Sequence, residues 1–238
     1  MRILGIHNRY QIRGGEEECY EAEVALLRQQ GHAVDLYEES NDQIAQTHKL
    51  VLALQTVWSQ SAYETVRQRL SQKHYDIVHV QNFFPLISPS IFYAAKAVGV
   101  PIVQTLHNYR LVCPNGLFFR DGHVCEDCVG KPVPYPAIIH GCYRQSQIAS
   151  GGVTTMLSVH RGLQTWQRQV DKYIALTEFA KQKFIEGGLP AKKIVVKTHF
   201  IDPDSGVGEG KGDYALFVGR ISVEKGLDTL LEAWQQIH

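Results

Sequence analysis

The sequence has no long hydrophobic run, no excess of one charge and no internal repeat. No apolar stretch approaches the roughly 18 residues of a membrane-spanning helix, and Met1 leads directly into strand-like residues instead of a secretion signal. Lys plus Arg is 24 and Asp plus Glu is 24, so the formal net charge is zero and nothing attracts nucleic acid in general. We therefore expect a cytoplasmic protein without a nucleic-acid partner.

The glycine pattern G-x-G-x-x-G of dinucleotide-binding proteins is also missing, which argues against a nicotinamide enzyme. In its place, Gly14 and Gly15 lie between the first expected strand and helix, where backbone amides can approach a phosphate. Glu16, Glu17 and Glu18 follow at once and would repel an anion held close by. On the residues alone, a phosphate contact and a plain turn remain equally open.

What the sequence does contain is an alternation of short apolar strands with helices, in a chain of 238 residues that is 44% hydrophobic and can bury a full core. This pattern predicts a Rossmann-like α/β fold, a parallel sheet flanked by helices with right-handed crossovers. The expected strands are 2–7, 32–37, 75–81, 101–106, 172–177 and 193–197, and the expected helices are 16–30, 43–73 (one or two), 85–98, 146–170 and 178–186.

The stretch from Lys49 to Trp58 is unusually apolar for a helix. It suits either a buried helix face or contact with a membrane surface. Because Lys49 is its only basic residue up to Glu64, and surface-seeking helices are usually basic, we favour the buried face.

The domain organisation follows from composition. Residues 1–201 form the Rossmann-like domain, with a proline-rich cysteine insertion at 113–142. Residues 202–213 hold four glycines and predict a linker. A further strand at 214–220 and a helix at 222–237 cannot make a domain together, so 214–238 is expected to be the truncated start of a second one.

Polar residues stand where three of the strands end. They are His107, Asn108, Tyr109 and Arg110 after strand 101–106, Gln81 and Asn82 at the end of strand 75–81, and Asn8 after strand 2–7. Ligands of open α/β sheets lie beyond these carboxyl ends. Amides, a phenol, a guanidinium and an imidazole suit a hydroxyl-rich ligand, and His107 can bind a sugar hydroxyl or relay a proton.

Four cysteines fall within thirty residues: Cys113, Cys125, Cys128 and Cys142. A structural zinc site is favoured, since it would explain the C-x-x-C pair and the order of a proline-rich insertion. Unligated buried thiols and disulfides remain alternatives, and His123 or His140 could replace a ligand. Cys19 lies on the first expected helix and is expected to belong to the hydrophobic core of the protein.

Near the carboxyl end, Arg220 follows the last expected strand and Lys225 lies in the first turn of the next helix. A guanidinium, an ammonium and free backbone amides together suit a diphosphate. The alternative is a solvated pair that caps a loop.

Several segments fall in a familiar order: D-I-V-H-V-Q-N at 76–82, T-L-H-N-Y at 105–109, A-L-T-E-F-A-K at 175–181 and F-V-G-R-I-S-V-E-K-G at 217–226. Together with the strand-G-G-helix start, they resemble the retaining glycosyltransferases of family 4, which have the GT-B fold. The cysteine insertion resembles that of a subset of these enzymes.

The resemblance implies two Rossmann-like domains, with the acceptor held by the first and the donor nucleotide-sugar by the second. It implies that Arg220 and Lys225 clamp the donor diphosphate, that Gly14 and Gly15 approach it, and that His107 lies beside the transferred sugar. The strand-end residues named above would then contact the acceptor. Such enzymes retain the anomeric configuration, use the leaving phosphate to help deprotonate the acceptor, and need no catalytic metal.

In the family, the acidic E-x7-E motif and the nucleotide-base pocket lie further along the second domain than the residues of this chain. Residues 197–202 also lack the asparagine-containing turn that is usual in the family. We therefore expect a hexosyltransferase of polysaccharide biosynthesis that is inactive without its missing carboxy-terminal domain. Its partners would be a nucleotide-sugar and a glycan or lipid-linked acceptor, with peripheral membrane contact left open. The alternatives are another GT-B activity, such as a nucleotide-sugar epimerase, and a non-catalytic zinc-held interaction module.

Overall fold

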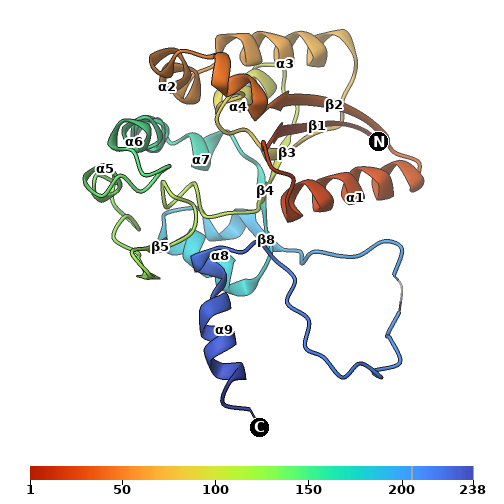
Figure 1. The fold of residues 1–238 in the computed structure, drawn as a ribbon. Helices are drawn as coiled ribbons and strands as arrows, with labels where there is room; N and C mark the ends of the chain where they lie inside the picture. The colour runs from red at the N-terminus through yellow and green to blue at the C-terminus, as the bar shows by residue number, and fades with distance from the viewer. Residues whose placement is uncertain (205, 238) are drawn as a thin grey trace.

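The computed structural model describes residues 1–204 and 206–237, and its centre is a sheet of six parallel strands in the order β2-β1-β3-β4-β7-β8 (Figure 1). The strands are β1 (Arg2–Arg9), β2 (Ala33–Ser40), β3 (Ile77–Asn82), β4 (Ile102–Leu106), β7 (Lys172–Ala175) and β8 (Ile194–Val196). Each expected strand of this sheet is present within a few residues. The Rossmann-like α/β prediction is confirmed.

Helices connect and flank the strands. They are α1 (Gly15–Gln29), α2 (Lys49–Val57), α3 (Gln60–Gln72), α4 (Ser90–Ala97), α5 (Pro136–Ile139), α6 (Gln147–Gly162), α7 (Thr165–Arg168) and α8 (Glu178–Glu186), with 3-10 turns η1 (Asn41–Gln46) and η2 (Ala191–Lys193). Hydroxyl caps fix where three helices begin, since Ser59, Ser146 and Thr177 accept from backbone amides of the first turn.

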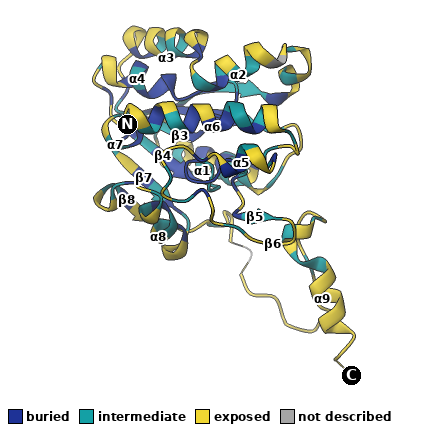
Figure 2. Ribbon diagram, turned by 90° about the vertical axis from the view of Figure 1, so that its left-hand side faces the viewer, coloured by how far each residue is buried: buried dark blue, intermediate teal, exposed yellow. Residues whose placement is uncertain are grey.

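Alternate residues of β1 face two hydrophobic clusters, because successive side chains of a strand point to opposite faces. Ile3 packs with Tyr20 and Val24 of α1. Leu4 and Ile6 belong to the larger cluster, to which α3, α4, α6 and α8 contribute. The burial colouring shows these inward faces as dark blue and the outward helix faces as yellow (Figure 2). No described helix is long and apolar enough to cross a membrane.

Two long helices of the sequence prediction are shorter in the structure. The helix expected at 85–98 begins only at Ser90, after a turn through Pro85. The helix expected at 146–170 is divided into α6 and α7 at Gln164, whose φ of 54° is left-handed and interrupts the helical backbone. Residues 43–73 contain two α-helices, which is one of the two arrangements that the sequence predicts.

The interpretation of α2 as a buried helix face holds for only part of the helix. Leu50 is 66% exposed and Leu54 is 72% exposed, while Ala53 faces Gly152 of α6 and Val57 packs against the larger hydrophobic cluster. Because α6 covers only one side of α2, the apolar residues on its other side have no neighbour among the described residues that buries them. Cys19, expected in the core, is only partly buried.

The strand expected at 214–220 is absent, since residues 206–222 carry no helix or strand. A strand needs a neighbour for its backbone hydrogen bonds, and none of the described residues supplies one there. The helix expected at 222–237 is present as a 3-10 turn, η3 (Val223–Lys225), followed by α9 (Leu227–Trp234). Figure 2 shows α9 lying away from the sheet, and its residues Leu230, Leu231 and Trp234 are exposed. The division into domains stays a prediction.

The cysteine insertion has little regular structure, as expected. A two-residue antiparallel pair, β5 (Phe119–Arg120) with β6 (His123–Val124), and the single turn of α5 are its only described elements. The insertion leaves the sheet after β4 and returns through α6, so it lies next to the carboxyl ends of the central strands (Figure 1).

Candidate functional site

The carboxyl ends of β1, β3 and β4 meet at one polar edge of the sheet, because the three strands are adjacent and parallel. His107 follows β4, and its ring is held by Gln81 of β3. His107 Nε2 lies 2.6 Å from Gln81 Oε1, while Gln81 Nε2 donates to Glu23 Oε2 at 2.5 Å. Since a carboxylate only accepts, the Gln81 nitrogen faces Glu23 and its oxygen faces His107. His107 therefore carries its proton on Nε2 and has an acceptor lone pair on Nδ1.

The environment keeps His107 uncharged. Burial, with a smaller effect from His199, lowers the pKa of His107 to about 3. The His199 ring stacks on the His107 ring at a centroid distance of 5.7 Å. Nδ1 of His107 is buried and has no hydrogen-bond partner among the described residues. His107 also lines a cavity of about 30 Å³, which has room for one water molecule.

Sequence reasoning missed the second half of this network. Glu23 of α1 also accepts from Lys197 Nζ at 2.8 Å, and Nδ1 of His79 lies 3.9 Å from its carboxylate. Burial opposes ionisation of Glu23, but its hydrogen bonds and the neighbouring positive charges outweigh burial and hold its pKa below the usual value. The unusual sequence of 197–202 was the only signal for Lys197 and His199.

Asn8 and Asn82, two of the predicted acceptor contacts, are buried and fully engaged inside the protein. Asn8 Oδ1 accepts from the backbone amide of Leu86 at 2.9 Å, and Asn8 Nδ2 donates to Asn41 at 2.9 Å. Asn82 Nδ2 donates to the carbonyl of Asn8 at 2.9 Å, and Asn82 Oδ1 accepts from the amide of Phe84 at 3.0 Å. These amides fix the loop after β3 against the end of β1.

Asn108 is a predicted acceptor residue whose side-chain nitrogen has only long contacts, while its Oδ1 accepts from the backbone amide of Arg110 at 3.1 Å. Its Nδ2 lies 3.3 Å from the Tyr10 hydroxyl and 3.5 Å from Glu16 Oε2. The carboxyl of Glu16 is largely enclosed, with Oε1 buried and without a hydrogen-bond partner among the described residues. Burial raises the pKa of Glu16 to about 8, so this carboxyl is protonated at neutral pH.

Tyr109 and Arg110 face the cysteine insertion. The Tyr109 ring packs on Phe118 at a centroid distance of 4.5 Å. The Arg110 guanidinium lies 4.4 Å from the centre of the Phe84 ring and donates to the carbonyl of Pro114 at 2.8 Å. Both residues therefore join the sheet edge to the insertion.

Gly14 and Gly15 form the start of α1, with Gly14 in the capping position. The expected repulsion by the three following acids is weaker than their formal charge indicates. Glu16 is protonated, Glu17 accepts from the amides of Tyr10 at 2.8 Å and Gly14 at 3.0 Å, and Glu18 pairs with Arg13 at 2.5 Å. The amide of Gly14 is thus occupied, and the amides of Glu17 and Glu18 donate to the carbonyl of Gly14. The first-turn amides left without a helical partner are those of Gly15 and Glu16.

His7 is a buried histidine beside this loop. Its ring stacks on Tyr20 at 4.5 Å, and its Nε2 lies 3.9 Å from Glu17. Burial lowers the pKa of His7 to about 4. His7 contributes packing between β1 and α1 and stays neutral near pH 7.

Arg220 and Lys225 are not brought to the sheet edge. Both are exposed, and Arg220 pairs with Glu224 of its own segment at 3.2 Å. No contact between either residue and Gly14 or Gly15 is present in the described parts of the chain. Their assignment to a donor diphosphate stays a prediction.

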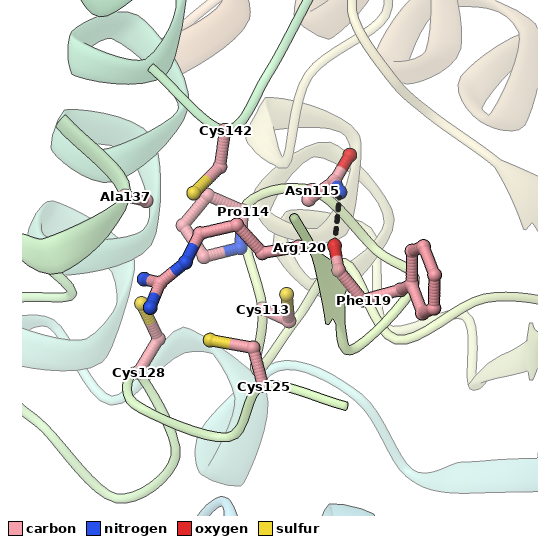
Figure 3. Close-up of a pocket in the computed structure, with 9 residues that line it drawn as sticks. All are labelled: Cys113, Pro114, Asn115, Phe119, Arg120, Cys125, Cys128, Ala137 and Cys142. Carbon is pink, nitrogen blue, oxygen red and sulfur yellow. Dashed lines mark hydrogen bonds between the residues drawn. The ribbon is translucent and has the colours of Figure 1, made fainter. Parts of the chain in front are cut away.

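The four cysteines of the insertion do come together. Cys113, Cys125, Cys128 and Cys142 line one cavity of about 10 Å³, and none forms a disulfide (Figure 3). Burial, followed by the charge of the neighbouring thiols, raises the pKa of Cys128 to about 11. The Arg120 side chain extends among the sulfurs (Figure 3). Within the described residues, no group of three or more His, Cys, Asp or Glu side chains is arranged to hold a metal ion. The zinc site stays a prediction.

Comparisons with known proteins place these features in a family. No curated protein matches the chain in sequence. Among solved structures, HepE of Anabaena in complex with UDP is 15% identical over 85% of this chain and 45% of its own, with a TM-score of 0.43. MnaA of S. aureus with UDP is 15% identical over 82% of this chain and 43% of its own, with a TM-score of 0.44.

The lipopolysaccharide outer core galactosyltransferase WaaB is 12% identical over 82% of this chain and 45% of its own, with a TM-score of 0.44. The chain spans less than half the length of these three proteins. A family model, in contrast, matches residues 13–205 directly, which is most of the chain. The chain belongs to Glycosyltransferase Family 4.

Proposed function

We propose that this chain is the acceptor-side part of a retaining hexosyltransferase, which moves a sugar from a nucleotide-sugar donor to a glycan or lipid-linked acceptor. Membership of Glycosyltransferase Family 4 supports a glycosyltransferase. The observation that supports the placing of the site is the buried array of His107, Gln81 and Glu23 at the carboxyl edge of the sheet.

In this proposal His107 lies beside the transferred sugar and accepts a hydrogen bond from one of its hydroxyls through Nδ1. Gln81 holds the Nε2 proton and so keeps Nδ1 available. Glycosyl transfer builds positive charge on the sugar ring. A neutral imidazole does not oppose that charge, whereas an imidazolium would, so the lowered pKa of His107 suits this position.

The donor diphosphate is proposed to approach the first turn of α1 at Gly15, with Gly14 shaping the turn. Arg220 and Lys225 would supply the positive charge from the segment after the linker, and no catalytic metal takes part. Asn108, whose Nδ2 makes two long hydrogen bonds, is an acceptor-side residue able to exchange the partners of that nitrogen for a sugar hydroxyl.

The test is a transfer assay on the chain alone and on the chain joined after residue 213 to the donor-binding domain of another Family 4 enzyme. Release of nucleoside diphosphate from UDP- and GDP-sugars is measured with an oligosaccharide and with a polyprenyl-phosphate-linked sugar as acceptors. We expect turnover only in the joined protein, with the product anomer matching the donor by NMR. His107→Ala should lower kcat by about 10–100-fold, the cost of one lost buried hydrogen bond.

His74→Ala is the matched control, because His74 is an exposed histidine before β3, at the opposite end of that strand from Gln81. Equal losses in both variants, or none in either, would contradict the role of His107. Conversion of the donor without any acceptor would instead support an epimerase. An inverted product would overturn retention.

The four cysteines are proposed to hold a structural zinc ion that fixes the insertion beside the acceptor site. Their convergence on one cavity supports this, since four thiols suit tetrahedral zinc. The Arg120 side chain would have to turn outward, where Asp127 already accepts from it at 3.1 Å.

A further inference from the structure

A cavity of about 400 Å³ lies between α2, α6 and the loop after β3. Its walls include Leu52 of α2, Ile148 and Val153 of α6, and Phe84. Phe84 also lines the small cavity at His107, so the two spaces share one wall. The larger volume is within the range of small-molecule sites and far above the space for one water molecule.

A glycine marks the place where the two helices of this cavity meet. A Cβ built on Gly152 of α6 would lie 3.5 Å from the Cβ of Ala53 in α2, which is ordinary contact. The preceding Gly151 has open space around the same position and does not line the cavity. A substitution at Gly152 therefore changes the cavity, and the same substitution at Gly151 changes only α6.

The cavity has one positive group and no acid in its lining. Arg144 is the only charged residue among the described residues that line it. Its guanidinium lies 5.7 Å from the centre of the Tyr143 ring, is exposed, and forms no ion pair within the described residues. A ligand with an apolar body and an anionic group matches both features.

The surface beside the cavity is also apolar. Leu50 and Leu54, one helical turn apart on α2, are exposed, as is Ile148 on α6. An exposed apolar rim next to an apolar cavity lets a flexible chain enter without crossing a polar surface.

We propose that this cavity binds the aliphatic chain of an anionic lipid, an acyl or prenyl phosphate, whose headgroup pairs with Arg144. This lipid is the anchor of the lipid-linked acceptor. Because Phe84 lines both cavities, a lipid bound here has its headgroup on the side of His107. The assignment as acceptor rests on the proposed function, whereas binding of the lipid does not.

Calorimetric titration of the intact chain with hexyl, octyl and decyl phosphate, each below its micelle concentration, tests the proposal without any variant. Each methylene buried in an apolar site strengthens binding by about 0.8 kcal/mol, or about fourfold. Affinity should therefore rise roughly tenfold or more at each step of two methylenes. An affinity that does not depend on chain length would overturn the proposal.

Gly152→Leu should fill the cavity and weaken decyl phosphate binding at least tenfold, while Gly151→Leu should leave it unchanged. Arg144→Gln should weaken decyl phosphate but not decanol. Thermal unfolding of each variant shows that it is folded. Equal binding by both leucine variants, or equal effects of Arg144→Gln on the two ligands, would contradict the site.

Competition separates the two sources of such a lipid. A short polyprenyl phosphate should displace decyl phosphate one for one, which supports the acceptor assignment. Displacement by phosphatidylglycerol vesicles alone would overturn it in favour of a membrane lipid. Absence of sugar transfer by the joined protein, together with chain-length-dependent binding by the intact chain, would refute the proposed function and leave this site standing.

Discussion

Replacing Glu16 with glutamine should stabilise the protein at neutral and alkaline pH and have no effect in acid. The Glu16 carboxyl is enclosed near the start of α1, where Tyr10 donates to its Oε2 at 3.2 Å and its Oε1 has no partner in the described chain. Glutamine keeps the shape of the side chain and an oxygen acceptor for Tyr10. It removes only the cost of ionising a buried carboxyl.

The sign and size follow from the pKa. Burial raises the pKa of Glu16 from 4.5 to about 8. Below pH 4.5 the carboxyl is protonated in both the folded and the unfolded chain. Between pH 4.5 and 8 only the unfolded chain releases the proton, so the stability of the folded state falls as pH rises through this window. An interval of about 3.5 pH units corresponds to at most about 5 kcal/mol, and about 3 kcal/mol if the pKa is one unit lower.

Urea unfolding at pH 4, 6, 8 and 9 measures the difference between the wild type and Glu16→Gln. The difference should be near zero at pH 4 and reach its maximum at pH 8 and above. Glu18→Gln is the control, because Glu18 is exposed and paired with Arg13, which lowers its pKa. A difference for Glu16→Gln that stays constant with pH, or that matches the control, would refute the reasoning.

Three further outcomes are expected. His107→Gln should make the protein less sensitive to acid. The pKa of His107 is about 3 in the folded chain and 6.5 in the unfolded chain, so the wild type loses stability as pH falls from 6.5 toward 3. Urea unfolding of the variant and the wild type across this pH range measures the difference. The purified chain should contain about one zinc per molecule by elemental mass spectrometry and lose it in Cys125→Ser; metal-free wild type would rule out the zinc site. Gly187→Ala should cost about 1–3 kcal/mol, because its Cβ would overlap a methyl carbon of Val112, whereas Gly162→Ala meets nothing within 4 Å and should not destabilise.

Much of the sheet could be predicted because its strands are short apolar runs bounded by polar residues, glycine or proline. The local sequence pattern does not determine features that depend on which helices and strands pack together. In α2, apolar composition predicted burial, but one helix partner leaves Leu50 and Leu54 exposed. At 214–220, strand propensity was present without an adjacent strand to complete the hydrogen bonds.

The candidate site was predictable where strand order alone brings residues together, as for Gln81 and His107. It was not predictable where a helix side chain reaches across the sheet edge. Glu23 and Lys197 are 174 residues apart in the sequence, and their contact depends on how α1 lies against the end of β8. For Asn8 and Asn82 the sequence predicted the position at the sheet edge but not the role. Their side-chain amides form hydrogen bonds with the backbone instead of facing a ligand.

The charges at the sheet edge bear on where a donor diphosphate could be held. His107 is neutral and Glu16 is protonated near pH 7, while Lys197 is paired with Glu23. The cations of the loop before α1, among them Arg13, are likewise paired with acids of that helix. Arg110 is the exception, because it forms no ion pair within the described residues, donates to the carbonyl of Pro114 and helps to lower the pKa of Glu16 against the larger effect of burial. Arg110 alone supplies one positive charge against the two or more of a diphosphate, so the proposed donor site still calls on Arg220 and Lys225 for the remainder.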